Sequence, residues 1–226
     1  MMSESTTQNI LNIVASGKPN DRWIAARKFI KLNQEAPTTQ LMELFINGGV
    51  DTKRAVLFII GKLKNGVQHS EVLITGLKHE NDGVFRTACE TARDLKFCSV
   101  AELIVKGLNS QSIGKIRSSL HGLEYAWSDE CFDSVFQLYK NHISIEVKKS
   151  AGYPLKINAS KVNWDKIFEA FSKDKIDRHR VWAGKIAYKY GDHSVIDALQ
   201  KLETDKNGHV RWHAKRAIRR IDENKF

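Results

Sequence analysis

The segment NGHVRWHAKRAIRRI, residues 207–221, decides the fold, because it combines an apolar periodicity with a dense positive charge. Val210, Ala214, Ala217 and Ile221 recur at spacings of four, three and four residues, which places them on one face of an α-helix. Basic residues and histidines fill most of the other positions. Three interpretations fit: a basic arm for nucleic acid, a metal site built on His209 and His213, or the last unit of a repeat.

An internal repeat favours the third interpretation. The step from Val210 to Ala214 recurs as Val84 to Ala88, and looser copies occur elsewhere. The second residue of each copy is here called the anchor, and the anchors are Ala25, Ala55, Ala88, Leu120, Ala151, Ala183 and Ala214. Their spacings are 30, 33, 32, 31, 32 and 31 residues, which is the period of stacked helical repeats.

Each anchor lies in an expected helix, and a shorter amphipathic segment precedes most of them, as TTQLMELFIN does at residues 38–47. Apolar residues follow most anchors at three, four and seven positions, which continues the helical face. Turn formers separate the segments, as in ENDG at 80–83 and DKNG at 205–208. The chain therefore predicts an all-α fold, an α-solenoid of about seven helix pairs that form a single domain over residues 1–226. Pro154 lies inside one expected helix and should kink or break it.

The segments HENDGVFRTACETARDL (79–95) and DKNGHVRWHAKRAIRRI (205–221) resemble units of the HEAT-like repeat family. In that family the second helix of each pair begins with an Asp-rich turn followed by Val-Arg-x-x-Ala. The resemblance extends through the period to essentially the whole chain. It implies a right-handed superhelix whose second helices line the concave side, in a family that mostly binds other macromolecules.

Composition restricts the function further. The content of 42% apolar and 27% charged residues is typical of a globular protein, and the longest apolar run, 55–60, is too short to cross a membrane. The first residues carry Glu4 and no basic residue, unlike a secretory leader, so we expect a cytoplasmic protein. The three cysteines fit neither a disulfide framework nor a zinc ribbon. The net charge of +10 favours an acidic or mixed-charge protein partner or nucleic acid, with the C-terminal repeats as the main contact region.

Basic and aromatic residues recur two and three positions before the anchors. They predict a binding surface for an anionic partner, with tryptophans supplying apolar area and arginines supplying directed hydrogen bonds. The predicted binding residues are Arg22, Trp23, Arg86, Arg117, Lys148, Lys149, Arg180, Trp182, Arg211, Trp212, Lys215 and Arg219. The alternative is structural: in HEAT-like repeats an Arg at this place commonly bridges to an Asp of the next unit. Carboxylates for such a ladder are available at Asp21, Asp51, Asp82, Glu146, Asp177 and Asp205.

Glu124 is the candidate catalytic residue, because it stands in an otherwise apolar column four positions after the anchors. HEAT-like alkylpurine DNA glycosylases combine a carboxylate with tryptophans on a basic face. Their second acid is not reproduced, since Phe136 follows Asp133 where it would be needed. Bridging of Glu124 to a Lys or Arg is the structural alternative.

No other catalytic motif occurs. His209 and His213 lack a carboxylate between them and lie beside arginines, so we expect no metal site, and we expect no cofactor. The sequence therefore predicts a non-enzymatic, monomeric binding module, such as an inhibitor, adaptor or immunity protein. The alternative is a nucleic-acid-binding protein, including a DNA-repair glycosylase that uses Glu124.

Overall fold

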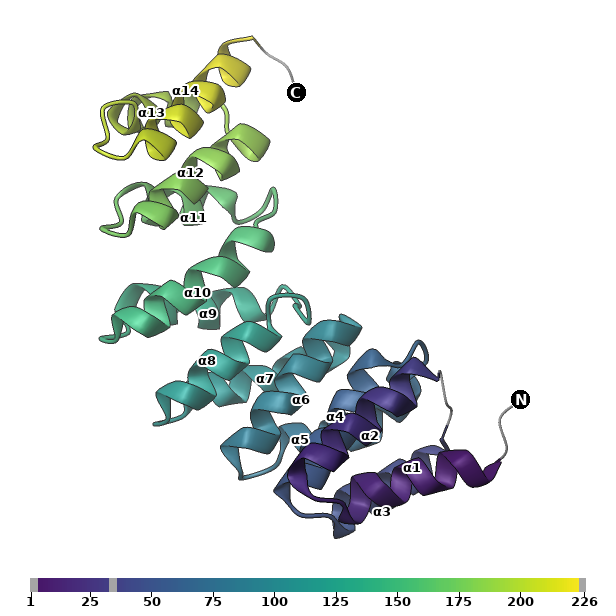
Figure 1. The fold of residues 1–226 in the computed structure, drawn as a ribbon. Helices are drawn as coiled ribbons and strands as arrows, with labels where there is room; N and C mark the ends of the chain where they lie inside the picture. The colour runs from purple at the N-terminus through teal and green to yellow at the C-terminus, as the bar shows by residue number, and fades with distance from the viewer. Residues whose placement is uncertain (1–3, 33–35, 224–226) are drawn as a thin grey trace. The chain divides into compact units, whose positions relative to one another are not determined.

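The computed structural model describes residues 4–32 and 36–223, and in these ranges the protein consists of helices and connecting turns without a β-strand. The part of the chain that the structure describes contains fourteen α-helices and four short 3-10 helices, which follow one another in sequence (Figure 1). The all-α solenoid class predicted from the period is confirmed.

The α-helices form seven pairs, in which a first (A) helix precedes a second (B) helix that carries the anchor. The A helices are α1 (Glu4–Ser16), α3 (Thr38–Asn47), α5 (Ser70–Leu77), α7 (Ala101–Lys106), α9 (Cys131–Asn141), α11 (Trp164–Ser172) and α13 (Ile196–Leu202). The B helices are α2 (Pro19–Lys31), α4 (Val50–Lys62), α6 (Asp82–Leu95), α8 (Ile113–Gly122), α10 (Ile145–Ile157), α12 (Asp177–Tyr190) and α14 (Gly208–Asp222). The 3-10 helices are η1 (Gly66–His69), η2 (Cys98–Val100), η3 (Gly107–Asn109) and η4 (His193–Val195).

The chain divides into two compact units, residues 1–134 and 135–226, called here the first and the second unit. In the first unit the B helices pack side by side, α2 against α4, α4 against α6 and α6 against α8. In the second unit α12 packs closely against α14 and also contacts α10. A single domain over residues 1–226 stays a prediction.

All seven anchors are buried, six of them alanines and one Leu120. Their small side chains let neighbouring B helices approach closely, and the apolar residues that follow them, such as Phe29 and Ala217, complete the core. The anchor pattern read from the sequence is therefore the pattern of the core.

Several B helices begin at the turn residues from which a helix start was predicted. The side chain of Asn81 accepts hydrogen bonds from the backbone N–H groups of Gly83 and Val84 at the start of α6. Ser112 and Asn207 cap α8 and α14 in the same way. Such caps satisfy N–H groups that have no partner inside the helix, and they fix where the helix starts.

Pro154 does not break its helix, since α10 runs from Ile145 to Ile157 without interruption. Pro154 and Leu155 are buried, and the Pro154 carbonyl accepts hydrogen bonds from the backbone and the side chain of Asn158. Burial of this apolar segment holds the helix together, so packing outweighs the local preference of proline. No helix in the described ranges is long and apolar enough to span a membrane.

Glycines let two B helices of the second unit touch. A Cβ atom on Gly184 of α12 would lie 2.8 Å from the Cβ of His213 and 3.0 Å from its carbonyl carbon, on α14. Gly114 of α8, by contrast, has only the Oγ of Ser112 nearby, at 3.5 Å.

We therefore expect Gly184→Ala to lower the free energy of unfolding by about 1–3 kcal/mol, because the added methyl group forces α12 and α14 apart. The matched control Gly114→Ala should be neutral or stabilising, since alanine favours helix where space is free. Urea unfolding of both variants measures the difference. A Gly184→Ala protein at least as stable as the wild type would contradict the close packing.

Candidate binding surface on the second unit

Positive charge is concentrated in the second unit. Residues 135–226 contain 20 Lys and Arg against 11 Asp and Glu, whereas residues 1–134 contain 16 against 15. The second unit therefore carries +9 of the net charge of +10. A charge imbalance of this size within one unit attracts anionic partners at long range.

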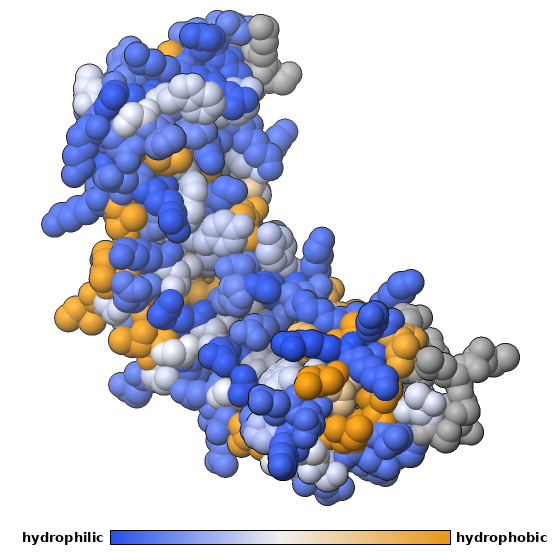
Figure 2. Space-filling model, viewed as in Figure 1, coloured by the Kyte–Doolittle hydropathy of each residue, from blue (hydrophilic) through white to orange (hydrophobic). Residues whose placement is uncertain are grey.

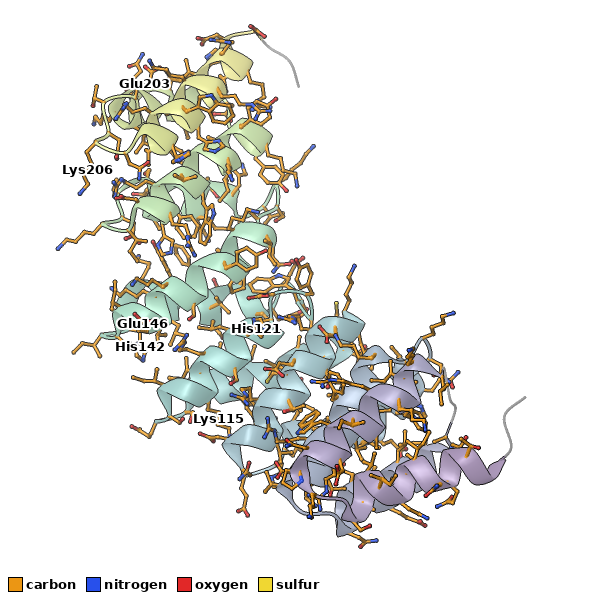
Figure 3. All side chains as sticks on the ribbon, in the orientation of Figure 1. Lys115, His121, His142, Glu146, Glu203 and Lys206 are labelled. Atoms are coloured by element: carbon orange, nitrogen blue, oxygen red, sulfur yellow. The ribbon has the colours of Figure 1, made fainter. Side chains whose placement is uncertain are left out.

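The acidic residues of the second unit lie mainly outside the middle of the B helices. Residues 147–164, 178–191 and 206–221, which contain most of α10, α12 and α14, include no Asp or Glu. Figure 3 shows Glu146, which lies in the first turn of α10, and Glu203, which follows the last residue of α13. In the space-filling view, hydrophilic residues dominate the visible face over α12 and α14 (Figure 2).

The centre of this surface is Arg216 on α14, whose guanidinium group lies between two aromatic rings. Its central carbon is 4.2 Å from the ring centre of Tyr188 on α12 and 5.4 Å from that of Trp212. Trp212 is 54% exposed, and Tyr188 is also exposed. Stacking on rings fixes the plane of a guanidinium while its edge N–H groups stay available for hydrogen bonds.

Other cations extend the surface from Arg216 to α10. Burial lowers the pKa of His213, and the charges of Lys185 and Arg216 lower this pKa further. Burial also lowers the pKa of Lys156 on α10, with further contributions from Lys185 and Lys189. Lys156, Lys185 and Lys189 line one pocket, and Arg216 lies on the ring of Tyr188, one turn after Lys185 on α12. These four cations form one surface, called here the cationic face.

Three of the basic residues predicted from the sequence bind backbone carbonyl groups. Arg22 and Lys148 do so at the C-terminal end of an A helix, and Arg211 does so in the turn before its own helix. Arg22 donates to the Ala15 carbonyl at 3.4 Å, and Lys148 donates to the Lys140 carbonyl at 3.2 Å. Arg211 donates to the carbonyls of residues 205 and 206 at 2.7 and 3.0 Å. Cations stabilise the negative end of a helix, so Arg22 and Lys148 join the two helices of their pairs, and Arg211 holds the turn that precedes α14.

Arg180 forms the ladder that was the structural alternative for this row. Its guanidinium donates to both carboxylate oxygens of Asp205, at 2.6 and 3.1 Å, and to Asp177 at 2.6 Å. It also donates to the Asp174 carbonyl at 2.8 Å, and only 9% of the residue is exposed. The hydrogen bonds to Asp205 raise the pKa of Arg180 and lower that of Asp205. Arg180 therefore connects α12 to the turn before α14, and we do not retain it in the binding surface.

The predicted tryptophans differ in position. Trp182 is buried, with ring centres at 5.3 Å from His179, 5.9 Å from Tyr153 and 6.1 Å from Phe171, so it belongs to the core and offers no contact surface. Trp23, in the first unit, is half-buried against the edge of Phe58. Trp212 is the tryptophan of the predicted set that is exposed.

The remaining predicted residues are exposed, and they come from four different B helices, α6, α8, α10 and α14. Arg86 and Lys149 form weak ion pairs within their own helices, at 3.9 Å to Glu90 and 3.5 Å to Glu146. Arg117, Lys215 and Arg219 are exposed, and the last two lie on α14. Lys156, Lys185, Tyr188 and Arg216 were not predicted. They occupy positions two and five after the anchors, a row that in the second unit consists entirely of basic residues and tyrosines.

Glu124, in the first unit, is bridged to basic side chains. Its carboxylate lies 2.9 Å from the Nδ1 of His121 (labelled in Figure 3) and 3.9 Å from the guanidinium of Arg93, which also bonds to the His121 ring. Arg93 and His121 line a depression of about 230 Å³ that Glu124 itself does not line. This arrangement matches the structural alternative for Glu124, and a catalytic role stays untested.

Sequence reasoning missed a buried polar cluster in the second unit. Asp174 accepts hydrogen bonds from the hydroxyl of Tyr139 and from the Nδ1 of His179, the latter at 2.9 Å. Burial lowers the pKa of His179 and raises that of Tyr139, so both stay neutral near pH 7. The cluster joins the α9, α11 and α12 segments in the core, and its signal was His179 at a position that is apolar in several other repeats.

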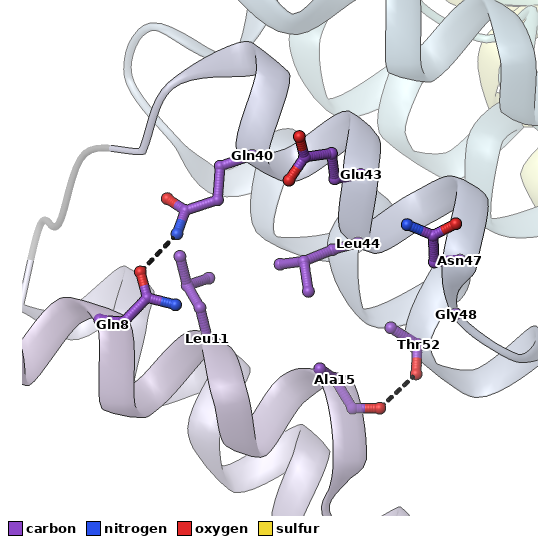
Figure 4. A pocket seen from close by; sticks show the side chains of 9 residues that line it. All are labelled: Gln8, Leu11, Ala15, Gln40, Glu43, Leu44, Asn47, Gly48 and Thr52. Atoms are coloured by element: carbon purple, nitrogen blue, oxygen red, sulfur yellow. Dashed lines mark hydrogen bonds between the residues drawn. The ribbon is translucent and has the colours of Figure 1, made fainter.

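The first unit has a pocket of about 270 Å³ between α1 and α3 (Figure 4). A hydrogen bond of 2.7 Å from Gln40 to Gln8 closes one end, and one of 3.2 Å from Thr52 to the Ala15 carbonyl closes the other. The polar groups at both ends are thus already paired. Across the described ranges no group of three or more His, Cys, Asp or Glu is arranged to hold a metal ion.

Solved structures are similar to this chain in fold alone. An engineered protein is 17% identical, with a TM-score of 0.61 over 95% of this chain and 68% of that one. A second engineered protein is 18% identical, with a TM-score of 0.54 over 96% and 97%. The complex of CpcE and CpcF of phycocyanin lyase from Nostoc sp. is 15% identical, with a TM-score of 0.55 over 95% and 94%. No family model matches the sequence, and no curated protein matches it. The similarities support a helical-repeat fold.

The Arg180 ladder predicts a large loss of stability in Arg180→Ala. Removing the guanidinium leaves the half-buried Asp205 carboxylate without its cation, so the free energy of unfolding should fall by about 3 kcal/mol. The control Lys173→Ala breaks an exposed pair with Glu169 and should cost at most about 1 kcal/mol. Guanidinium chloride unfolding at pH 7 distinguishes them.

The ion pair between Arg180 and Asp205 predicts that the stability of the fold depends on pH. Because the folded pKa of Asp205 is lowered, its stabilising contribution is complete above the unfolded value near 3.9 and disappears as the pH falls through the folded value. The difference in stability between the wild type and Arg180→Ala should therefore shrink below about pH 4. A difference that stays constant down to pH 2 would contradict the ladder.

Proposed function

We propose that this protein is a HEAT-like, non-enzymatic binding module whose cationic face on the second unit binds an acidic protein partner. The observation that carries the proposal is the stacked guanidinium of Arg216. Two exposed aromatic rings hold it at the surface, and residues 206–221 supply no carboxylate to neutralise it. Exposed Trp, Tyr and Arg together are the residue types that dominate the binding energy of protein interfaces.

The distribution of charge supports the same proposal. The basic residues that cap A helices or form the Arg180 ladder are needed by the fold, whereas Lys185, Lys189, Lys215 and Arg219 stay exposed. Like charges gathered at a surface destabilise the protein, so their presence favours a role with an anionic partner. Lys149 and Lys215 of the second unit remain proposed peripheral contacts, whereas the role predicted for Arg86 and Arg117 of the first unit is untested.

A nucleic acid is the second candidate, because stacked aromatic rings and cations on one surface are also suited to bases and phosphates. Such binding would release counterions and weaken steeply as the salt concentration rises. A partner that buries Trp212 in an apolar contact would show a smaller dependence on salt.

The test is affinity capture of the partner from the native host lysate, with and without nuclease, at low and moderate salt. The double variant Trp212→Ala/Arg216→Glu should lose the retained protein by at least tenfold, because it removes both the exposed ring and the stacked cation. The control Lys201→Glu changes an exposed lysine on the A helix α13 of the same unit. It should retain the partner, and all three proteins should melt at the same temperature.

Two results would contradict the proposal. If Lys201→Glu loses the partner as much as Trp212→Ala/Arg216→Glu does, the net charge of the protein attracts the partner and no specific surface is involved. Recovery of nucleic acid alone, removed by nuclease and by salt, would establish the second candidate.

A further inference from the structure

Three lysines of the cationic face line a pocket between α10 and α12. The pocket has a volume of about 340 Å³, and its walls are formed by Lys156, Ile157, Ala159, Lys185, Ile186, Lys189 and Tyr190. The hydroxyl of Tyr190 donates to the Ala159 carbonyl at 2.6 Å and so connects the end of α12 to the segment after α10. The lining of the pocket therefore combines three lysines with apolar side chains.

The three ammonium groups have no carboxylate to neutralise them in the part of the chain that the structure describes. Residues 147–164 and 178–191, which hold the pocket, contain no acidic residue, and the ion pairs of the second unit involve other lysines and arginines. Two of the lysines lie over aromatic rings instead: Lys189 is 4.7 Å from the ring centre of Tyr190, and Lys156 is 5.9 Å from that of Tyr153. Aromatic faces attract cations without removing their charge.

We infer that this pocket binds a phosphate monoester group carried by the protein partner, the three lysines serving as its ligands. A monoester carries close to two negative charges at pH 7 and three acceptor oxygens, so it can neutralise several crowded ammonium groups at once. A phosphodiester carries one charge, and its neighbours along a strand need an extended groove. The pocket volume suits one compact group and the side chain that bears it. Burial, and to a smaller extent the charges of Lys185 and Lys189, lower the pKa of Lys156, and a bound anion would offset the repulsion among the three lysines.

The position of the pocket deepens the proposed function and rests on it. Lys185 lines the pocket, and Tyr188, one turn later on α12, has its ring centre 4.2 Å from the guanidinium of Arg216. The pocket and the stacked guanidinium therefore lie on the same face, so one partner segment can place a phosphate among the lysines and a carboxylate at Arg216.

The experiment measures fluorescence anisotropy of a labelled peptide with one phosphoserine among neutral residues, against the same peptide with serine. We expect the phosphopeptide to bind at least tenfold more tightly to the wild type. Lys156→Met and Lys185→Met should each weaken it at least fivefold, whereas Lys201→Met on α13 should leave it unchanged. Lys185 and Lys201 are exposed and Lys156 is half-buried, and methionine keeps the length and the apolar stem of the side chain, so the three variants should melt like the wild type.

Three results would overturn the inference. The first is equal affinity for the two peptides, or equal weakening by Lys201→Met. The second is competition by inorganic phosphate at the affinity of the phosphopeptide, which would assign the pocket to a free anion. The third is a single-stranded oligonucleotide that binds more tightly than the phosphopeptide and depends on the same lysines.

Phosphatase treatment separates this inference from the proposed function. If the captured partner is lost after treatment and also in Lys156→Met, both stand. If it depends on Trp212 and Arg216 but not on phosphate or Lys156, the proposed function stands and the phosphate pocket is rejected. If the phosphopeptide binds but no protein is captured, the pocket stands and the proposed partner fails.

Discussion

The close approach of neighbouring B helices is the constraint on which the rest of the structure depends. Helix axes can come this near only where the facing side chains are small, and the anchors at Ala88, Ala183 and Ala214, with Gly184 beside them, provide this. Once the anchors face the neighbouring helix, every other position of a B helix has a fixed direction. In the second unit, the residues two and five after each anchor are half-buried or exposed, whereas Leu57 and Ile60 at these positions of the first unit are buried.

This geometry gives two different roles to basic residues of one chemical type. Arg22, Lys148 and Arg211 end at backbone carbonyls of their own helix pair, and Arg180 ends at carboxylates of the next turn. Their charge is neutralised or stabilised inside the fold. Within the described ranges, the four cations of the cationic face are neutralised by no such acceptor. Arg220, which is not part of that face, donates to the backbone carbonyls of residues 187 and 191. The surface charge of the second unit is therefore a separate property from its structural arginines.

The period, the anchors, the caps and the all-α class follow from the sequence because each rests on local rules that every repeat obeys. The binding surface could not be predicted from the sequence in the same way. To predict which side chains are exposed, the rotation of each B helix about its axis must be known to within one residue. Trp182 and Trp212 illustrate this: they stand one and two positions before their anchors, yet one is buried against Phe171 and the other is exposed. The role of Glu124 depends on its contacts with His121 and Arg93. Arg93 belongs to the preceding repeat, so spacing within one repeat could not identify it as a partner.

Arg180 and Arg220 also determine how the end of the chain unfolds. Arg180 lies in the first turn of α12 and holds the loop that leads into α14, whereas Arg220, in the last turn of α14, holds the carbonyls at the end of α12. The two arginines thus connect α12 and α14 at opposite ends of their contact, and each arginine belongs to a different helix. Fraying of a terminal repeat ordinarily begins at a free end and proceeds turn by turn. Here neither end of the α12–α14 contact can open without releasing a guanidinium, so the last two repeats should open as one cooperative segment.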